Sequence, residues 1–420
     1  MEQERTNYMD CCDWDQCTEC GQCLRECPVL QLDEDTAIYE FRQLLQGKEA
    51  PNVFNKCTLC FDCNQLCPEG LRPHELILQR LIENRKGKIK YYLKYMVNGM
   101  PGGDMFQDYY AKMSPEEKDI LRKWSQYPPA GSKDILWVGC LGKMICKDLD
   151  NSQVLKDLPK FGPPDVCCGE LAYRLIGWDC YTDVVERILK RFEGLDIERM
   201  VCYCASCYNF LSNILPKVYG KKLPFKLVSM YEWMLEKVEQ GELEVKKPLK
   251  YKDKLAISES CYVSELGEKF QQDLRKLYEI AGADLVELPH HGDHNLSCGM
   301  VSIGREMSLI KGALRTSRKK MEDLKATSVK DMALNCPGCF LGLKGTNYFK
   351  LPWNKFRKMH YMPDELLEAF GDELETPLAE KMGGIFNTLL KNKLKLFKKV
   401  DYPLPKISVE SDPDDILKSP

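Results

Sequence analysis

The sequence predicts an α/β protein that has a helical N-terminal domain ahead of two tandem units with parallel β-α-β character. Three observations predict this fold. Ten of the 22 cysteines fall within the first 70 residues, where hydrophobic periodicity is weak. From residue 134 onward, short apolar runs alternate with helical segments, which is typical of a parallel sheet. The order of these runs, and of the cysteine motifs that follow them, then repeats, which indicates a duplicated unit.

Composition limits the classes of protein to consider. The chain has 420 residues, 44% hydrophobic and 29% charged, which is a soluble globular composition with room for two or three domains. Its net charge of −3 gives no reason to expect nucleic acid as a partner. No apolar run approaches the ~18 residues needed to cross a bilayer, and the polar, acidic start does not look like a secretory signal. We therefore expect a cytoplasmic protein that is peripheral on the inner face of the membrane only through a partner.

Twenty-two cysteines are too many for an ordinary cytosolic enzyme. A secreted disulfide scaffold is the obvious alternative, but such scaffolds are usually short chains with a signal peptide. This chain has 420 residues, and we expect no signal peptide. Because clustered cysteines in a reducing compartment serve metal binding or redox chemistry, their arrangement indicates the function.

Residues 1–85 are predicted to be a ferredoxin-type domain with two [4Fe–4S] cubane clusters. The spacing Cys-x2-Cys-x2-Cys-x3-Cys-Pro begins at Cys17 and again at Cys57, and the fourth cysteine of each such run binds the other cluster. The predicted ligand sets are Cys17, Cys20, Cys23 and Cys67 for one cubane, and Cys57, Cys60, Cys63 and Cys27 for the other. Two four-cysteine zinc sites are the alternative, which two identical spacings, each ending in proline, disfavour. Gly21 suits the tight loop of the first run, where a side chain could collide with the cluster.

Residues 86–133 are interpreted as a helical connector, punctuated by a Gly-Gly and a Pro-Pro pair. Residues 134–248, which we call unit 1, follow it. Five cysteines follow the ends of its predicted strands or lie between them: Cys140, Cys167, Cys168, Cys204 and Cys207. Since the carboxyl ends of parallel strands collect ligands in open α/β sheets, these five thiolates favour a soft metal centre. The alternative is that adjacent cysteines are buried small hydrophobes, which the second copy of the pattern disfavours.

Residues 249–350, which we call unit 2, repeat this order with a difference. Strands are predicted at 255–257, 285–288 and 332–334, and the cysteines near them are Cys261, Cys298, Cys336 and Cys339. Ser297 stands where unit 1 has the first cysteine of its Cys-Cys-Gly (CCG) motif. Four thiolates suit an iron–sulfur cluster or a zinc ion. The preceding His290, His291 and His294 would either tune such a site and pass protons or be ordinary loop residues.

Residues 351–420 are predicted to be a C-terminal extension. Its basic amphipathic stretch, residues 385–400, is interpreted as a solvated helix packed on its own protein, and the alternative is contact with an anionic membrane surface or a partner. Residues 408–420 are expected to form a flexible acidic tail. No GxGxxG fingerprint is present, so binding of a flavin or nicotinamide by this chain is not supported.

Two ferredoxin runs followed by two CCG units resemble the D subunit of heterodisulfide reductase, over about residues 10–350. The pattern is similar also to the iron–sulfur subunits of glycolate oxidase and anaerobic glycerol-3-phosphate dehydrogenase. The resemblance implies a noncubane [4Fe–4S] cluster on the five cysteines of unit 1, where disulfide chemistry would take place. Unit 2 departs from the family pattern at Ser297, at Ser258-Glu259, where His-Asp is usual, and at Tyr262, where histidine is common.

The expected function is that of an iron–sulfur subunit of an anaerobic oxidoreductase complex, which passes electrons through two cubanes to the noncubane cluster for disulfide or thiol redox chemistry. The alternative is a non-catalytic relay between a flavoprotein dehydrogenase and a quinone, cytochrome or other acceptor. Either role implies other oxidoreductase subunits as partners, a flavoprotein or a membrane cytochrome b-type protein. The least favoured alternative is a scaffold that holds zinc in both units.

Overall fold

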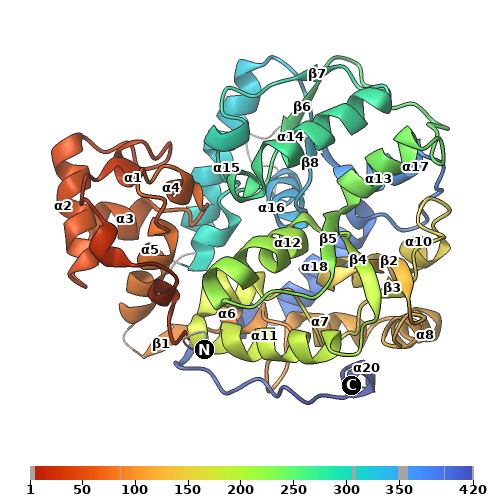
Figure 1. Ribbon diagram of the computed structural model, residues 1–420, viewed down its shortest axis with the longest axis horizontal. Coiled ribbons are helices and arrows are strands. Elements are labelled where there is room, and N and C mark those ends of the chain that lie inside the picture. Colours follow the sequence, from red (N-terminus) through yellow and green to blue (C-terminus); the bar gives the residue numbers. More distant parts are fainter. Residues whose placement is uncertain (1–4, 86, 305–308, 349–357, 392, 419–420) are drawn as a thin grey trace.

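The computed structural model describes residues 5–85, 87–304, 309–348, 358–391 and 393–418. Figure 1 shows a lobe of short helices beside a larger body that contains both four-stranded sheets. The lobe is the N-terminal part of the chain, and the larger body contains units 1 and 2. Figure 1 therefore shows the predicted helical N-terminal region, and the α/β class is confirmed by the parallel sheets.

The N-terminal lobe is built from short helices joined by cysteine-bearing loops. After the 3-10 turns η1 and η2, its helices are α1 (Gln22–Arg25), α2 (Glu34–Leu45), α3 (Pro51–Lys56), α4 (Asp62–Gln65) and α5 (Pro73–Glu83). The longest, α2, begins where the Asp33 carboxylate accepts a hydrogen bond from the Thr36 N–H at 2.9 Å. The helix α5 has Pro73 in its first turn, where a missing N–H is tolerated.

The connector contains helices and one strand that pairs with the C-terminal extension. Its elements are β1 (Lys88–Lys90), α6 (Tyr91–Tyr95), α7 (Met105–Tyr110) and α8 (Pro115–Trp124). A capping box of Ser114 and Glu117 begins α8. Strand β1 pairs antiparallel with β10 (Lys399–Asp401), from the C-terminal extension. Segments far apart in the sequence therefore lie side by side at this edge of the molecule.

Unit 1 contains a parallel sheet in the order β3-β2-β4-β5. Its strands are β2 (Ser132–Trp137), β3 (Lys160–Phe161), β4 (Ile197–Cys202) and β5 (Lys226–Ser229). Its helical segments are α9 (Gly139–Gly142), η3 (Lys143–Ile145), α10 (Cys146–Asn151), η4 (Ala172–Ile176), α11 (Trp178–Phe192), α12 (Ala205–Asn209), η5 (Phe210–Tyr219) and α13 (Met230–Glu239). The central strands are buried at their carboxyl ends, and the cysteine loops follow directly.

Unit 2 contains a second parallel sheet, in the order β7-β6-β8-β9, which matches the strand order of unit 1. Its strands are β6 (Leu255–Ser258), β7 (Leu285–Val286), β8 (Asp331–Leu334) and β9 (Lys358–Tyr361), and its long helices are α14 (Val263–Ile280), α15 (Leu309–Ala326) and α16 (Pro337–Tyr348). The 3-10 segments are η6 (Gly292–His294) and η7 (Met300–Gly304). Strand β9 lies beyond residue 350, so this sheet continues into the segment that sequence patterns assign to the C-terminal extension.

The C-terminal extension contains α17 (Met362–Ala369), α18 (Leu378–Lys391), α19 (Lys393–Leu396) and α20 (Pro413–Lys418). Helices α18, α19 and α20 pack against the connector, α18 also packs against η3 of unit 1, and α17 packs against β9. The prediction of a flexible tail after residue 408 is wrong for residues 408–418, because Leu417 is buried and Arg191 donates to the Ser411 carbonyl. The predicted amphipathic stretch forms α18 and α19, with Leu394 82% exposed, while Asn392 lies outside the described residues. Among the described helices, none combines the length and apolarity that a membrane crossing needs.

Candidate functional site: a thiol-lined cavity beside a ferredoxin-type lobe

The cysteines of the N-terminal lobe gather in two groups. The Cys23 thiol interacts electrostatically with those of Cys17, Cys20 and Cys67. The Cys63 thiol interacts with those of Cys57, Cys60 and Cys27, and also with that of Cys23. Burial raises the pKa of both the Cys23 and the Cys63 thiol. These groups correspond to the crossed ligand sets that the spacing predicts, and sets of four thiols suit cubane clusters; that they hold clusters stays a prediction.

The two ferredoxin-type loops share a left-handed backbone conformation at one position but have different residues there. Gly21 has φ +69°, and a Cβ there would lie 2.6 Å from the backbone nitrogen of Ile38 in α2. The neighbour that excludes a side chain is therefore α2. The equivalent residue of the second loop is Phe61, which has φ 72° although it is not glycine. A left-handed conformation is costly for such a residue, so the placement of the Phe61 ring needs a reason.

The thiols of both units line one cavity of about 170 Å³. Its wall contains all nine predicted cysteines of the two units: Cys140, Cys167, Cys168, Cys204, Cys207, Cys261, Cys298, Cys336 and Cys339. Most of the rest is apolar and comes also from the connector and the C-terminal extension, as with Met96, Phe106 and Ile385. Such a wall excludes water while presenting sulfur ligands, which suits soft metal centres.

In unit 1 the five thiols form a continuous chain of contacts. Cys167 is hydrogen-bonded to Cys140 and to Cys168, and these contacts hold the pKa of the Cys167 thiol well below its usual value. Cys207 continues the chain between Cys168 and Cys204. A Cβ at Gly139, which has φ +69°, would lie 2.9 Å from the Cys207 sulfur. Glycine therefore lets this thiol approach the turn that carries Cys140.

In unit 2 the four thiols also lie together. Cys339 is hydrogen-bonded to Cys298 and to Cys336, and the contact with Cys339 lowers the pKa of the Cys336 thiol. Cys261 interacts electrostatically with Cys298 and Cys336. Ser297 is turned into its own loop, where its hydroxyl accepts a hydrogen bond from the Gly299 N–H at 3.1 Å. Within the described residues, no three or more His, Cys, Asp or Glu side chains are grouped so as to hold one metal ion.

Family models match the three cysteine-bearing parts of the chain. Residues 13–71 match the 4Fe-4S dicluster domain, and residues 136–212 and 255–344 match the CCG cysteine-rich domain. The chain therefore contains one 4Fe-4S dicluster domain followed by two CCG cysteine-rich domains. Both matches to the CCG model fall within units 1 and 2, and the match to the dicluster model includes all eight ferredoxin-type cysteines.

Three relatives of this CCG-domain protein differ in length. An uncharacterized iron–sulfur protein of Methanocaldococcus jannaschii is 26% identical over 221 residues, covering 47% of this chain and 44% of the relative. The EtfAB:quinone oxidoreductase of Syntrophomonas wolfei is 20% identical over 413 residues, covering 80% and 55%. The D subunit of the dihydromethanophenazine:CoB–CoM heterodisulfide reductase of Methanosarcina mazei is 23% identical over 369 residues, covering 77% and 87%. The predicted resemblance to heterodisulfide reductase is confirmed, and the chain spans about half the length of the first two relatives.

A buried lysine accompanies the thiols of each unit of the CCG-domain protein. Lys143 donates to the carbonyls of Pro163 and Val166, and Lys320 donates to the Asn295 side chain at 2.6 Å. Burial lowers the pKa of both amines, while the nearby thiols act in the opposite direction. Each lysine therefore places an amine close to a group of thiols, where its protonated form would lower the cost of holding several thiolates in an apolar cavity.

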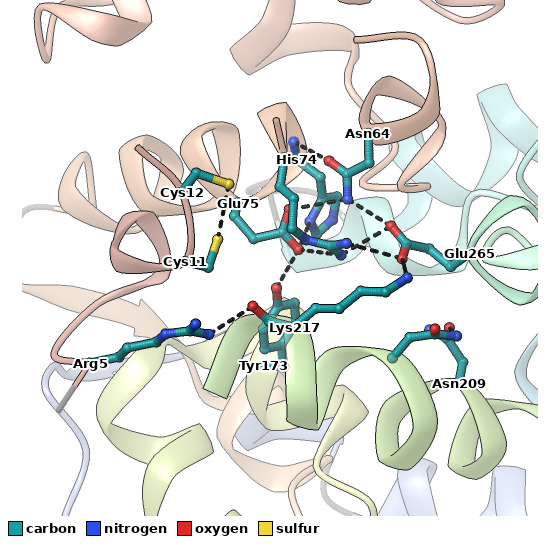
Figure 2. Close-up of polar contacts among 12 residues, drawn as sticks. Arg5, Cys11, Cys12, Asn64, His74, Glu75, Tyr173, Asn209, Lys217 and Glu265 are labelled. Carbon is teal, nitrogen blue, oxygen red and sulfur yellow. Dashed lines mark hydrogen bonds and ion pairs between the residues drawn. The ribbon is translucent and has the colours of Figure 1, made fainter. Parts of the chain in front are cut away.

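The lobe and the units of the CCG-domain protein meet in a buried ionic network, shown in Figure 2. Arg72 lies 3.1 Å from Glu75 and 3.0 Å from Glu265, which belongs to α14 of unit 2. Asn64 donates to the same two carboxylates at 3.1 and 2.8 Å, and Tyr173 of unit 1 donates to Glu75 at 2.7 Å. Burial would raise the pKa of Glu75, but Arg72 and neighbouring groups lower it to about 2. The network fixes the lobe against both units.

The remaining cysteines and the loop histidines of unit 2 lie away from the cavity. The other five cysteines, which are Cys11, Cys12, Cys146, Cys180 and Cys202, are not among the described residues that line it. Figure 2 shows Cys11 and Cys12 near Glu75, with their sulfurs 3.6 Å apart. The three loop histidines of unit 2 also lie outside the described cavity wall. His290 bonds to Asp323 at 2.7 Å and His291 to the Leu288 carbonyl at 2.7 Å.

Sequence patterns do not single out the charged residues of this region. Arg174 and Glu170 line the cavity and form an ion pair of 2.8 Å. The available signal is their i,i+4 spacing directly after the CCG motif of unit 1, but such pairs are common on exposed helices. Burial of the pair depends on the other domains packed around it, which local sequence does not report.

Proposed function

We propose that this protein is the iron–sulfur subunit of an anaerobic oxidoreductase complex in which electrons enter through the ferredoxin-type lobe and are used for disulfide or thiol chemistry in the shared cavity. One observation carries the proposal: the thiols of unit 1 and unit 2 line the same small, mostly apolar cavity. The proposal includes two cubanes on the lobe cysteines and a noncubane cluster on Cys140, Cys167, Cys168, Cys204 and Cys207. Clusters bound there would supply one-electron transfers.

The residues of the cavity suit such a reaction. Reduction of a disulfide takes up two electrons and two protons and breaks one S–S bond to give two thiols. Apolar side chains such as Phe106 and Leu171 keep bulk water away from the reacting sulfur atoms. Lys143 and Lys320 offset negative charge that accumulates near the thiols when electrons arrive. The partner that delivers electrons is proposed to be a flavoprotein or a membrane cytochrome b-type subunit.

A second candidate is a non-catalytic relay to a quinone or cytochrome. It is favoured by the orientation of Ser297, whose hydroxyl is engaged with the Gly299 N–H, so that unit 2 offers four thiols. The relative named EtfAB:quinone oxidoreductase, which aligns with 80% of this chain, also supports it. As a relay, the protein would hold clusters in the shared cavity but admit no substrate.

Metal content and turnover test the proposal. The full chain is purified anaerobically, and iron, acid-labile sulfide and zinc are quantified. About 12 irons would correspond to two cubanes and one cluster in unit 1, and about 16 irons to a further cluster in unit 2. About 8 irons with zinc in both units would refute the proposal. Turnover of a small disulfide with reduced viologen, compared with reduction of a quinone analogue, separates the catalytic role from the relay.

A matched pair of variants assigns the site. Cys168→Ser is expected to remove one cluster signal, about 4 irons, and disulfide turnover, while the lobe clusters remain. Cys202→Ser is the control, because Cys202 is as deeply buried in β4 but lies outside the described cavity wall. Unchanged spectra in Cys168→Ser, or equal losses in both variants, would overturn the assignment of unit 1.

A further inference from the structure

Arg174 joins three parts of the protein at one point. It lies in η4, five residues after Gly169 of the unit 1 CCG motif, and its side chain is fully buried. Its Nη2 donates to the Leu59 carbonyl, in the loop between Cys57 and Cys60 of the second ferredoxin-type run. The same nitrogen lies 3.1 Å from the sulfur of Cys261 in unit 2. One planar cation therefore contacts a lobe loop and a predicted ligand of unit 2.

The ring beneath this cation occupies an unusual backbone position. The Arg174 guanidinium lies 5.0 Å from the centroid of Phe61, and the His74 ring stacks on Phe61 at 3.9 Å. Phe61 keeps the left-handed conformation that Gly21 has in the first loop. Strained non-glycine residues persist where the surroundings over-determine them, which is frequent at functional sites. At this position the second loop thus accepts backbone strain and places an aromatic ring against Arg174, whereas the first loop has glycine.

The network of Figure 2 fixes this junction from the other side. Asn64 directly follows Cys63, and it donates to Glu265 at 2.8 Å. Glu265 lies in the first turn of α14, four residues after Cys261. The ligand loop of the lobe and the segment that carries Cys261 are therefore held together at two points, Arg174 and Glu265. Gln65 adds a bond from the lobe to the Asp293 carbonyl of unit 2.

A buried guanidinium at a cysteine sulfur has a definite electrostatic effect. Hydrogen bonds to the sulfurs and the local net charge set the reduction potential of an iron–sulfur centre. A positive charge stabilises the form that has gained an electron, and it does so more strongly in a water-excluded interior. Arg174 always carries its charge, so no proton transfer is needed when one electron leaves the lobe and one arrives at unit 2.

We propose that Arg174 is a positioning residue for electron transfer, which couples the second ferredoxin-type loop to unit 2 through Cys261, so that electrons reach unit 2 before unit 1. This proposal rests on the proposed function, because it assumes a redox centre on Cys261, Cys298, Cys336 and Cys339. The proposal also gives the departure from the family pattern at Ser297 a role. Unit 2, with four thiols, receives electrons from the lobe first, and unit 1, with five thiols, uses them for the reaction.

The test is an EPR-monitored redox titration of the full chain under anaerobic conditions. Cys298→Ser identifies the unit 2 signal by its loss, and Cys168→Ser identifies that of unit 1. In Arg174→Met the reduction of unit 2 is expected to become about tenfold less favourable, which is about 59 mV for one electron. Arg174→Lys should show a smaller shift, and the lobe signals should keep their potentials. Arg187→Met is the matched control, because Arg187 is a buried arginine of unit 1 that bonds to the carbonyls of Asp165 and Ser408.

Rapid freeze-quench after mixing with reduced viologen gives the order of reduction. We expect the unit 2 signal to develop before that of unit 1 in the wild-type chain. An unchanged unit 2 potential in Arg174→Met with iron retained, earlier reduction of unit 1, or zinc in unit 2 would each overturn the proposal. If the Arg174 variants lose the unit 2 centre, the order of reduction in the wild type decides. Failure of the proposed function is distinguishable, since disulfide turnover would then be absent while the potential shift and the order stand.

Discussion

Replacing Arg72 with methionine should destabilise the protein by removing the cation between two buried carboxylates. Glu75 is fully buried and the Glu265 side chain is 5% exposed, so neither carboxylate would regain solvent. The pKa of Glu75 is lowered from 4.5 to about 2. A lowering of this size corresponds to about 3 kcal/mol in the free energy of unfolding at neutral pH. Breaking a buried ion pair by removing one partner costs about 3–5 kcal/mol, so two independent routes give a similar magnitude.

The assay is thermal unfolding of the anaerobic holoprotein, followed by circular dichroism and by cluster absorbance. In a chain of 420 residues, a loss of about 3 kcal/mol should lower the midpoint by roughly 3 °C. Arg42→Met is the control, because the Arg42–Glu19 pair is about half exposed on both sides and should contribute less than about 1 kcal/mol. If Arg72→Met unfolds at the same temperature as Arg42→Met, the argument from burial is wrong.

The pH dependence gives a second check on the same variant. Since the pKa of Glu75 is depressed in the folded protein, its stabilisation is fully present above its unfolded pKa and is lost as the pH falls through the folded value. The contribution of Glu75 to the wild-type midpoint should therefore be constant between pH 5 and pH 8. In Arg72→Met burial should raise the pKa of Glu75, so the difference in midpoint between the two proteins should narrow as the pH falls. A difference that widens as the pH falls would contradict this account.

Three further predictions concern other parts of the molecule. Gly139→Ala should cost unit 1 its cluster, about 4 irons, because the new Cβ would lie 2.9 Å from the Cys207 sulfur, whereas Gly131→Ala, at a similar φ with nothing within 4 Å, should retain full iron content. His360→Gln should lower the unfolding midpoint at pH 6 more than at pH 9. Burial alone would lower the pKa of His360, but two flanking carboxylates outweigh burial and raise it. The stabilisation by His360 is therefore lost as the pH rises through the raised pKa. Asp148→Asn should cost about 1–3 kcal/mol in the same assay, because the buried carboxylate accepts from two backbone N–H groups of the C-terminal extension.

Much of the fold could be predicted because its signals are local. The parallel strands β2, β4, β6 and β8 are short apolar runs, and each can be recognised without knowledge of its neighbours. The grouping of the lobe cysteines follows from spacing alone. In contrast, β9 reads Lys-Met-His-Tyr, which has no apolar run, and it becomes a strand because β8 offers it a parallel edge. The docked segment after Ser408 is polar, and what holds it is a set of partners more than two hundred residues away.

The candidate site, like the fold, could be predicted only in part. Cysteine patterns point to the nine thiols, but nothing in the sequence says that both units share one cavity, since this depends on how the units pack. Arg174 and Glu75 are charged residues, which sequence rules place at the surface unless paired. Cys261, the partner of Arg174, comes from unit 2, and Arg72, although only three residues before Glu75, also pairs with Glu265 of unit 2. Only the assembled structure shows that these charges are buried and where they act.

The pairing of β1 with β10 has a consequence for how the protein is made. Both units lie between these strands in the chain, so β1 emerges from the ribosome long before its partner exists. Domains generally fold in order of synthesis, and Ile385, which completes part of the cavity wall, also comes late. The thiols of units 1 and 2 are therefore present before the last wall of their cavity.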